Sequence, residues 1–214
     1  MTRVLGIDEA GRGPVIGPLV MAGLMIDEGK EEMLGEVKDS KLLAHKKRIK
    51  LDKHLRENFE YKIAIASPRE IDAALNSTTL NLNWLEAIKQ AEIINSLKPD
   101  IAIIDCPSAN PTKYTEYLKN LLENKSIKLI IEHKADVNYP VCSAASILAK
   151  VERENQVDKI KEKYGDCGPG YPAHPKTIEF VKNNWNKYPD IFRKTWSTYK
   201  KIVEKEKRIQ RTLL

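Results

Sequence analysis

The sequence predicts an α/β protein with a mixed central sheet, because strand-like runs come first in succession and later alternate with helical patterns. Apolar runs at residues 4–7, 15–26 and 61–66 indicate an early meander, and those at residues 100–105 and 127–131 are separated by helical spacing. A chain of 214 residues, of which 42% are hydrophobic, is long enough to bury one substantial core.

Local signals support each element in turn. Pro14 and Pro18 disfavour a helix at the start of the second apolar run, which therefore indicates a strand or hairpin. Ser67, Pro68 and Glu70 form a helix start, with a serine cap, a proline in the first position and a glutamate three residues after the cap. Helical spacing predicts further helices at residues 44–59, 80–97, 113–123, 143–164, 176–185 and 197–213.

The composition is typical of a soluble globular protein in a reducing compartment. No stretch approaches about 18 consecutive apolar residues, and no leader with a cleavage site is visible, so we expect a cytoplasmic protein without a membrane span. Cys106, Cys142 and Cys167 show no C-x-x-C spacing and fit reduced thiols. The four histidines are scattered at no ligand spacing, which argues against zinc.

Charge is distributed unevenly along the chain. Residues 1–133 hold 19 Lys and Arg against 20 Asp and Glu, whereas residues 134–214 hold 17 against 10. The net charge of +6 therefore arises entirely in the C-terminal part. Such a basic region indicates a polyanionic partner, most simply nucleic acid, although a solvated helical surface would give the same count.

Three of the predicted strands lead into acidic residues. Asp8 and Glu9 follow the first strand, Asp105 ends the fourth, and Asp136 comes shortly after the fifth. Sites in α/β sheets form beyond the carboxyl ends of strands, so these carboxylates converge if the strands are neighbours. Two divalent cations about 3.5–4 Å apart would neutralise such a cluster and support in-line phosphoryl displacement. Because adjacent strand residues point to opposite faces, Asp8 and Glu9 share a site only if the chain bends there, and the glycines that follow favour a nearby bend.

Two other kinds of site fit the sequence poorly. Residues 11–17 nearly match a dinucleotide-binding fingerprint, but the last glycine is one residue late and a proline-bearing apolar run follows in place of a helix. A Ser-His-Asp hydrolase is disfavoured because the chain contains no nucleophile-elbow sequence.

An ordered set of motifs resembles the type 2 ribonuclease H family (RNase HII) over residues 3–200. The motifs are Gly6-Ile7-Asp8-Glu9-Ala10-Gly11-Arg12-Gly13, Lys38-Asp39-Ser40-Lys41, Ile104-Asp105, Glu132-His133-Lys134-Ala135-Asp136, Ala144-Ala145-Ser146-Ile147-Leu148-Ala149-Lys150-Val151 and Gly168-Pro169-Gly170-Tyr171-Pro172. Pro14 and Pro169 depart from the residues frequent at these places, and the segment after Trp196 is less diagnostic.

The resemblance implies a ribonuclease H-like fold with a five-stranded mixed central sheet flanked by helices. It implies a catalytic core over residues 1–175 and a small basic helical region over residues 176–214 packed on that core. It also implies an endonuclease that cuts the RNA strand of an RNA–DNA hybrid, or a lone ribonucleotide in duplex DNA, leaving 3′-hydroxyl and 5′-phosphate ends.

Residue by residue, the resemblance implies two Mg²⁺ or Mn²⁺ ions held by Asp8, Glu9, Asp105 and Asp136. Asp8 would bridge both ions. Asp136 would help hold the ion that activates water, and Glu9 and Asp105 would hold the ion at the leaving 3′ oxygen. The carboxylates are thus both the metal ligands and the catalytic residues of the expected site.

Recognition of RNA is expected beside these acids. Only RNA carries a 2′-hydroxyl, and a glycine-rich turn lets backbone groups approach it closely. The resemblance places Tyr171 against the sugar next to the scissile phosphate. The expected substrate-binding residues are Gly11, Arg12, Gly13, Lys41, Ser143, Ser146, Lys150 and Tyr171.

Two alternative functions come from other classes of protein. Another metal-dependent nuclease of the same superfamily, such as a junction resolvase, would share the acids but would not need the glycine turn and the tyrosine. A non-catalytic RNA-binding module would leave the acids unexplained. We expect a monomer with no membrane contact, and the sequence leaves contact with a sliding clamp open.

Overall fold

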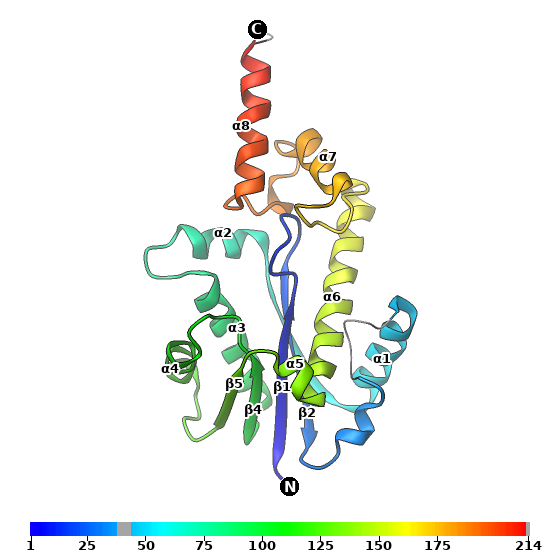
Figure 1. Ribbon diagram of the computed structural model, residues 1–214, viewed down its shortest axis with the longest axis vertical. Helices are drawn as coiled ribbons and strands as arrows, with labels where there is room; N and C mark the ends of the chain where they lie inside the picture. The colour runs from blue at the N-terminus through cyan, green and yellow to red at the C-terminus, as the bar shows by residue number, and fades with distance from the viewer. Residues whose placement is uncertain (38–43, 213–214) are drawn as a thin grey trace. The chain divides into compact units, whose positions relative to one another are not determined.

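The structure is a computed structural model that describes residues 1–37 and 44–212, so Lys41 lies outside the described residues. Its elements follow one another as drawn in Figure 1. The strands are β1 (Arg3–Ala10), β2 (Leu19–Asp27), β3 (Glu60–Ala66), β4 (Ile101–Asp105) and β5 (Lys128–Glu132). The helices are α1 (His45–Asn58), α2 (Pro68–Asn76), α3 (Leu82–Leu97), α4 (Pro111–Leu121), α5 (Ala135–Asn138), α6 (Pro140–Tyr164), α7 (Pro175–Asn184) and α8 (Ser197–Thr212), with 3₁₀ turns η1 (Glu31–Leu34) and η2 (Pro189–Ile191).

The five strands form one mixed sheet in the order β3-β2-β1-β4-β5. β1 is antiparallel to β2 and parallel to β4, and β4 is parallel to β5. The predicted fold class, an α/β fold with a five-stranded mixed sheet, is therefore confirmed.

Helices cover both faces of the sheet, with α3 and α4 on one side and α1 and α6 on the other (Figure 1). At two glycines of the sheet, a helix packs directly against the strand backbone. A side chain on Gly6 would lie 2.4 Å from the Val141 carbonyl carbon of α6, and one on Gly23 would lie 2.4 Å from Ile93 of α3. Because strand side chains alternate, the even-numbered positions of β1 face α6 and the odd-numbered ones face α3.

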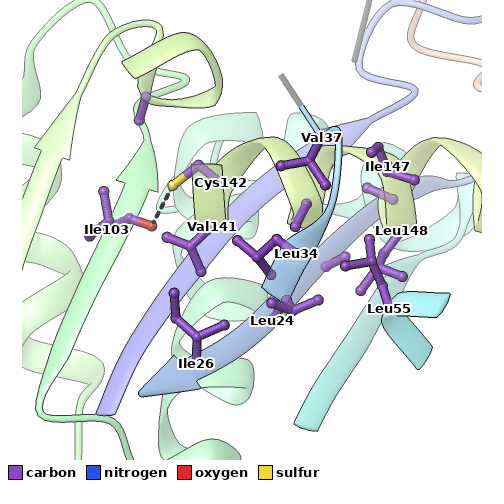
Figure 2. Packing of buried hydrophobic residues seen from close by; sticks show 14 of the residues in the cluster. Leu24, Ile26, Leu34, Val37, Leu55, Ile103, Val141, Cys142, Ile147 and Leu148 are labelled. Atoms are coloured by element: carbon purple, nitrogen blue, oxygen red, sulfur yellow. Dashed lines mark hydrogen bonds between the residues drawn. The ribbon is translucent and has the colours of Figure 1, made fainter. Parts of the chain in front are cut away.

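The core on the α6 side is shown in Figure 2. Val141, Ile147 and Leu148 of α6 pack with Leu24 of β2 and Leu55 of α1. The buried thiol of Cys142 donates to the Ile103 carbonyl of β4 at 3.2 Å, which ties the start of α6 to the middle of the sheet.

By its internal contacts the chain forms two compact units, each built from three segments. The sheet unit comprises Met1–Ala10, Val20–Ile65 and Leu82–Glu152, and holds most of the sheet. The turn unit comprises Gly11–Leu19, Ala66–Asn81 and Arg153–Leu214. The division into domains at residues 1–175 and 176–214 stays a prediction.

The turn unit has its own apolar cluster. Val15 and Ile16 pack there with Phe180, Phe192 and other buried residues. α8 joins this cluster through Tyr199, Ile202 and Val203, so its first two turns are anchored by packing. Within the described residues, no helix is long and apolar enough to cross a membrane.

Three element boundaries differ from the sequence-based prediction by three residues or more. The first strand does not end before the acids but continues through Asp8 and Glu9 to Ala10. The second strand begins at Leu19, because the Val15 and Ile16 N–H groups donate to the Gly170 carbonyl at 2.8 and 3.3 Å. The long helix begins at Pro140, three residues before the predicted start, and the single turn of α5 precedes it.

Candidate active site

Asp8 and Asp105 end up side by side because their strands are parallel neighbours. Ile7 pairs with Ile104 in the β1–β4 register, so the next residue of each strand is an aspartate. Both are on the face that α6 covers, since Gly6, two positions before Asp8, contacts Val141. The parallel register of β1 and β4 therefore places the carboxylates of Asp8 and Asp105 next to each other.

Asp8 sits in an environment that opposes its ionisation. Its residue is only 6% exposed, and burial raises the pKa of its carboxyl from 3.8 to about 7. The Ser146 hydroxyl and the Glu9 N–H, which donates to Asp8 Oδ1 at 2.7 Å, lower this pKa, and the charges of Asp105 and Asp136 raise it. Ser146 acts at a longer range than a standard hydrogen bond. The coupling shows that the three aspartates share one electrostatic environment.

Asp136 is brought in by a tight turn after β5. Lys134 adopts a left-handed conformation with φ 64°, which reverses the chain into α5. The Ala135 N–H then donates to Asp105 Oδ1 at 3.0 Å. Asp136 follows in the first turn of α5, buried, and its main-chain carbonyl accepts the Ser143 hydroxyl. These hydrogen bonds therefore connect the end of β4, the turn at Lys134 and the starts of α5 and α6.

Ser143, Ser146 and Lys150 lie along one face of α6, at spacings of three and four residues. Ser143 and Ser146 are buried, whereas Lys150 is half-buried. The interaction of Ser146 with Asp8 and of Ser143 with the Asp136 backbone places the first turns of this face beside the aspartates.

The side chain of Glu9 is not on the same face of β1 as that of Asp8. The β1–β2 pairing continues without interruption from Asp8↔Ala22 through Glu9↔Met21 to Ala10↔Val20. The chain therefore does not bend between Asp8 and Glu9, and Glu9 is on the opposite side of the strand. The bend comes two residues later, at Gly11, whose φ is 89°.

The donors fit a divalent cation in chemistry, although they do not enclose one. Carboxylate oxygens are the ligands that Mg²⁺ and Mn²⁺ prefer, and the mutual repulsion of three aspartates is what a cation relieves. Across residues 1–37 and 44–212, no three His, Cys, Asp or Glu side chains are near enough together to hold one ion. Ligation would require the carboxylates to draw together around the cation.

The predicted recognition residues Gly11, Arg12 and Gly13 form an irregular segment in the turn unit. A side chain on Gly11 would lie 2.8 Å from the Pro18 carbonyl oxygen, so this position requires glycine. A side chain on Gly13 would meet only Tyr171 Cε1, at 4.0 Å. The exposed Gly13 is therefore a neighbour of the Tyr171 ring.

Tyr171 belongs to the same unit and is 43% exposed. The guanidinium of Arg153 lies over its ring, 4.9 Å from the centroid, and also donates to the Pro169 carbonyl at 2.6 Å. Burial lowers the pKa of Arg153. This arginine, absent from the sequence-based predictions, braces the loop that carries the tyrosine.

The comparisons with known proteins decide the family. The model of the family Ribonuclease HII matches residues 5–199. Ribonuclease HII of Pyrococcus abyssi is 42% identical to this chain, covering 99% of this chain and 96% of that protein. The chain belongs to the ribonuclease HII family. It is thus an enzyme, a hydrolase with ribonuclease H activity.

Solved ribonuclease HII structures share the fold. The crystal structure of ribonuclease H2 from Pyrococcus horikoshii OT3 superposes with a TM-score of 0.86 at 41% identity, covering 96% of this chain and 99% of that one. The PCNA:RNase HII complex from Archaeoglobus fulgidus gives a TM-score of 0.81 at 40% identity, covering 91% and 95%.

Sequence reasoning about this ribonuclease HII chain missed three residues that surround the turn. They are Arg153, Arg193 and Trp196. In the sequence, each is an ordinary member of a basic or aromatic stretch. Only contacts over more than 10 residues of separation distinguish them, and local patterns carry no such signal.

Proposed function

We propose that this enzyme cleaves the RNA strand of RNA–DNA hybrids and incises duplex DNA at single embedded ribonucleotides, leaving 5′-phosphate and 3′-hydroxyl ends. The observation that carries the proposal is the placement of Asp8 and Asp105 side by side on neighbouring parallel strands, with the buried Asp136 in the helical turn that follows β5. Such a cluster suits phosphodiester hydrolysis, because cations held there offset the negative charge of the phosphate.

Asp8, Asp105 and Asp136 are assigned as ligands of two divalent cations, Mg²⁺ or Mn²⁺. Glu9 is assigned as the fourth ligand, which requires the end of β1 to turn its side chain toward the aspartates, because in this structure it is on the opposite face of the strand. When bound, the cations lower the pKa of the attacking water and offset charge on the leaving 3′ oxygen. Asp8 and Asp105 each bond a backbone N–H through one oxygen, and these bonds orient the carboxylates.

Phosphate binding is assigned to α6 and to Lys41. Lys150 offers a positive charge on a face of α6 whose first turns lie beside the aspartates. Ser143 and Ser146 are on the same face but buried, and the Ser143 hydroxyl already donates to the Asp136 carbonyl. A lysine binds phosphate as a compact charge without geometric demands. Lys150 and Lys41 therefore supply affinity for the backbone, whereas Ser143 and Ser146 contact a phosphate only after their hydroxyls become accessible.

Ribose recognition is assigned to the turn unit. The exposed Gly13 and the half-exposed Tyr171 are neighbours, so a single sugar can contact the backbone of residues 11–13 and the tyrosine together. The Arg153 guanidinium fixes the ring from one side. A backbone N–H or C=O that bonds the 2′-hydroxyl discriminates RNA from DNA, which lacks this group.

We also propose that the enzyme is a cytoplasmic monomer that contacts a sliding clamp. The clamp contact is supported by the Archaeoglobus fulgidus relative, whose structure is a PCNA:RNase HII complex. Light scattering after size-exclusion chromatography, with the chain alone and mixed with a clamp, tests both statements: a mass above one chain contradicts the monomer, and separate elution contradicts the contact.

A cleavage assay on four matched substrates tests the function. These are an RNA–DNA hybrid, a DNA duplex with one ribonucleotide, an all-DNA duplex and a four-way DNA junction, each in Mg²⁺ and in Mn²⁺. We expect cleavage of the first two alone, with 5′-phosphate products. Cleavage of the junction would favour a resolvase, and binding without cleavage would favour an RNA-binding module.

A further inference from the structure

Arg193 is a buried cation in the turn unit whose guanidinium lies over the Trp196 ring, 4.9 Å from its centroid, and bonds the turn. It is 0% exposed, and its guanidinium donates to three main-chain carbonyls: Nη2 to Gly11, Nη1 to Arg12 at 2.8 Å and Nε to Gly17 at 3.0 Å. A guanidinium is planar, with its donors in a rigid fork, so it imposes its own geometry on the carbonyls that it bonds.

The segment that carries Arg193 is itself fixed. Asp72 of α2 accepts the N–H groups of Lys194 and Thr195, both at 2.9 Å, and the Thr195 hydroxyl at 2.6 Å. The Arg193 N–H donates to the Val15 carbonyl at 2.9 Å. Trp196 then donates its indole N–H to the Gly13 carbonyl at 3.1 Å. All of these residues belong to the turn unit.

The direction of these carbonyls determines the direction of the neighbouring amides. In a planar trans peptide, the C=O of one residue and the N–H of the next point in opposite directions. The described residues contain no cis peptide bond. Because the carbonyls of Gly11 and Arg12 point at Arg193, the N–H groups of Arg12 and Gly13 point away from it.

We propose that Arg193 is a positioning residue that sets the two peptide planes of the Gly11-Arg12-Gly13 turn, so that the Arg12 and Gly13 N–H groups face the ribose of the substrate. Trp196 assists by holding the next carbonyl. The inference rests on the proposed function for its ligand, a ribonucleotide in a duplex. Its structural half, the ordering of the turn by a buried guanidinium, stands independently of that function.

The first test measures order in the turn without substrate. The Val15 and Gly17 N–H groups donate to Gly170 and Ile191, so their hydrogen exchange reports the turn. In Arg193→Lys, one ammonium cannot reach three carbonyls, and we expect exchange at these amides about tenfold faster or more. Arg56→Lys is the matched control, because Arg56 bonds Asp52 and Glu152 in the other unit. Unchanged exchange in Arg193→Lys would overturn the proposal.

The second test measures recognition. For Arg193→Lys we expect KM on a duplex with one ribonucleotide to rise about tenfold or more, with a smaller change in kcat, because the carboxylates are untouched. Inhibition by an all-DNA duplex should come closer to inhibition by a ribonucleotide-containing one. A purely structural role would instead lower the active fraction, and so kcat, with KM and this preference unchanged.

Trp196→Phe removes the indole N–H and keeps a smaller aromatic ring beneath the Arg193 guanidinium, so it tests the proposal if Arg193→Lys does not fold. We expect a smaller shift in the same direction, and no shift in KM or preference would contradict the proposal. If the wild-type enzyme cleaves neither ribonucleotide substrate, the proposed function fails, and the exchange experiment still decides whether Arg193 orders the turn.

Discussion

A single buried carboxyl, Asp8, is the residue on which the proposed site depends most. It is held by the strand in a place where burial and two other aspartates disfavour its charge, and its pKa is raised to about 7. At the protein surface, water would stabilise the charged form of this carboxylate. It could not then share a cation with Asp105 and Asp136.

Asp8→Asn should abolish cleavage while the fold is kept. The amide is the same size as the carboxyl, but it carries no charge to hold the bridging position. We expect the single-turnover rate in saturating Mg²⁺ to fall at least about a thousandfold. Circular dichroism checks the fold, and a variant that keeps more than about a tenth of the wild-type rate would refute the assignment of Asp8 as the bridging ligand.

The same substitution should stabilise the protein in chelator, and more so at high pH. The pKa of Asp8 is about 7 in the folded protein, against an ordinary value of 3.8 for the unfolded chain, so the unfolded chain ionises first as pH rises. Stability is therefore lost from about pH 4 to pH 7, by on the order of 4 kcal/mol. Asn does not titrate, so the melting temperature of Asp8→Asn should exceed that of the wild type clearly at pH 8 and hardly at pH 4. Parallel melting curves across this range would show that Asp8 is not buried as a charge.

At the scale of elements, the turn at residues 11–13 has two glycines with different duties. Gly11 has a positive φ and lies against the Pro18 carbonyl, so it shapes the turn. Gly13 has room for a side chain, with only Tyr171 at 4.0 Å. One glycine thus serves the fold, and the other leaves the backbone open to an approaching sugar.

Substitutions at the two glycines should separate these duties. Gly11→Ala places a side chain in a left-handed conformation and a short contact, which should cost about 1–3 kcal/mol of stability. Gly13→Ala should melt close to the wild type, yet lose kcat/KM on both ribonucleotide substrates, because a methyl group stands between the backbone and the ribose. Thermal melts and kinetics on both variants check this; full activity of Gly13→Ala would show that no substrate comes close to that backbone.

The sequence predicted most elements because their signals are local. The capping box of Ser67 and Glu70 starts α2 as expected, with the Glu70 N–H and Ser67 N–H both bonded. Residues 15–18 were misassigned because their backbone partners, Gly170 and Ile191, are more than 150 positions away. The aspartates could be predicted because they follow apolar strand patterns. The position of Glu9 on the opposite face of β1 could not, because it follows only from the uninterrupted β1–β2 register.

At the scale of the whole molecule, charge is the feature to explain. The net charge is +6, and α8 carries the exposed Lys200, Lys201 and Lys205 on a helix that Tyr199, Ile202 and Val203 anchor. Truncation before α8 would therefore remove apolar packing together with charge. Substitution of the exposed lysines isolates the electrostatic contribution.

The variant with Lys200, Lys201 and Lys205 all changed to Gln should bind a hybrid more weakly and with a flatter salt dependence. Removing one lysine–phosphate interaction reduces the slope of log K against log salt by about 0.9 on B-form DNA. Replacing Glu204 and Glu206 by Gln on the same helix should have the opposite effect on affinity. Fluorescence anisotropy over a salt series measures both, and identical slopes in all three proteins would place the binding surface elsewhere.

The bonds from Arg193 to the turn span almost the entire chain, with separations of 176 to 182 positions. During synthesis from the N-terminus, Asp8, Glu9 and the turn are made early, but the side chain proposed to order the turn is among the last to emerge. Contacts of such long range close late in folding. A nascent chain therefore completes the turn long before the residue proposed to order it is available. Ribosome-bound chains arrested before residue 193 should show no ribonucleotide preference, and chains extended past the end of α8 should acquire it.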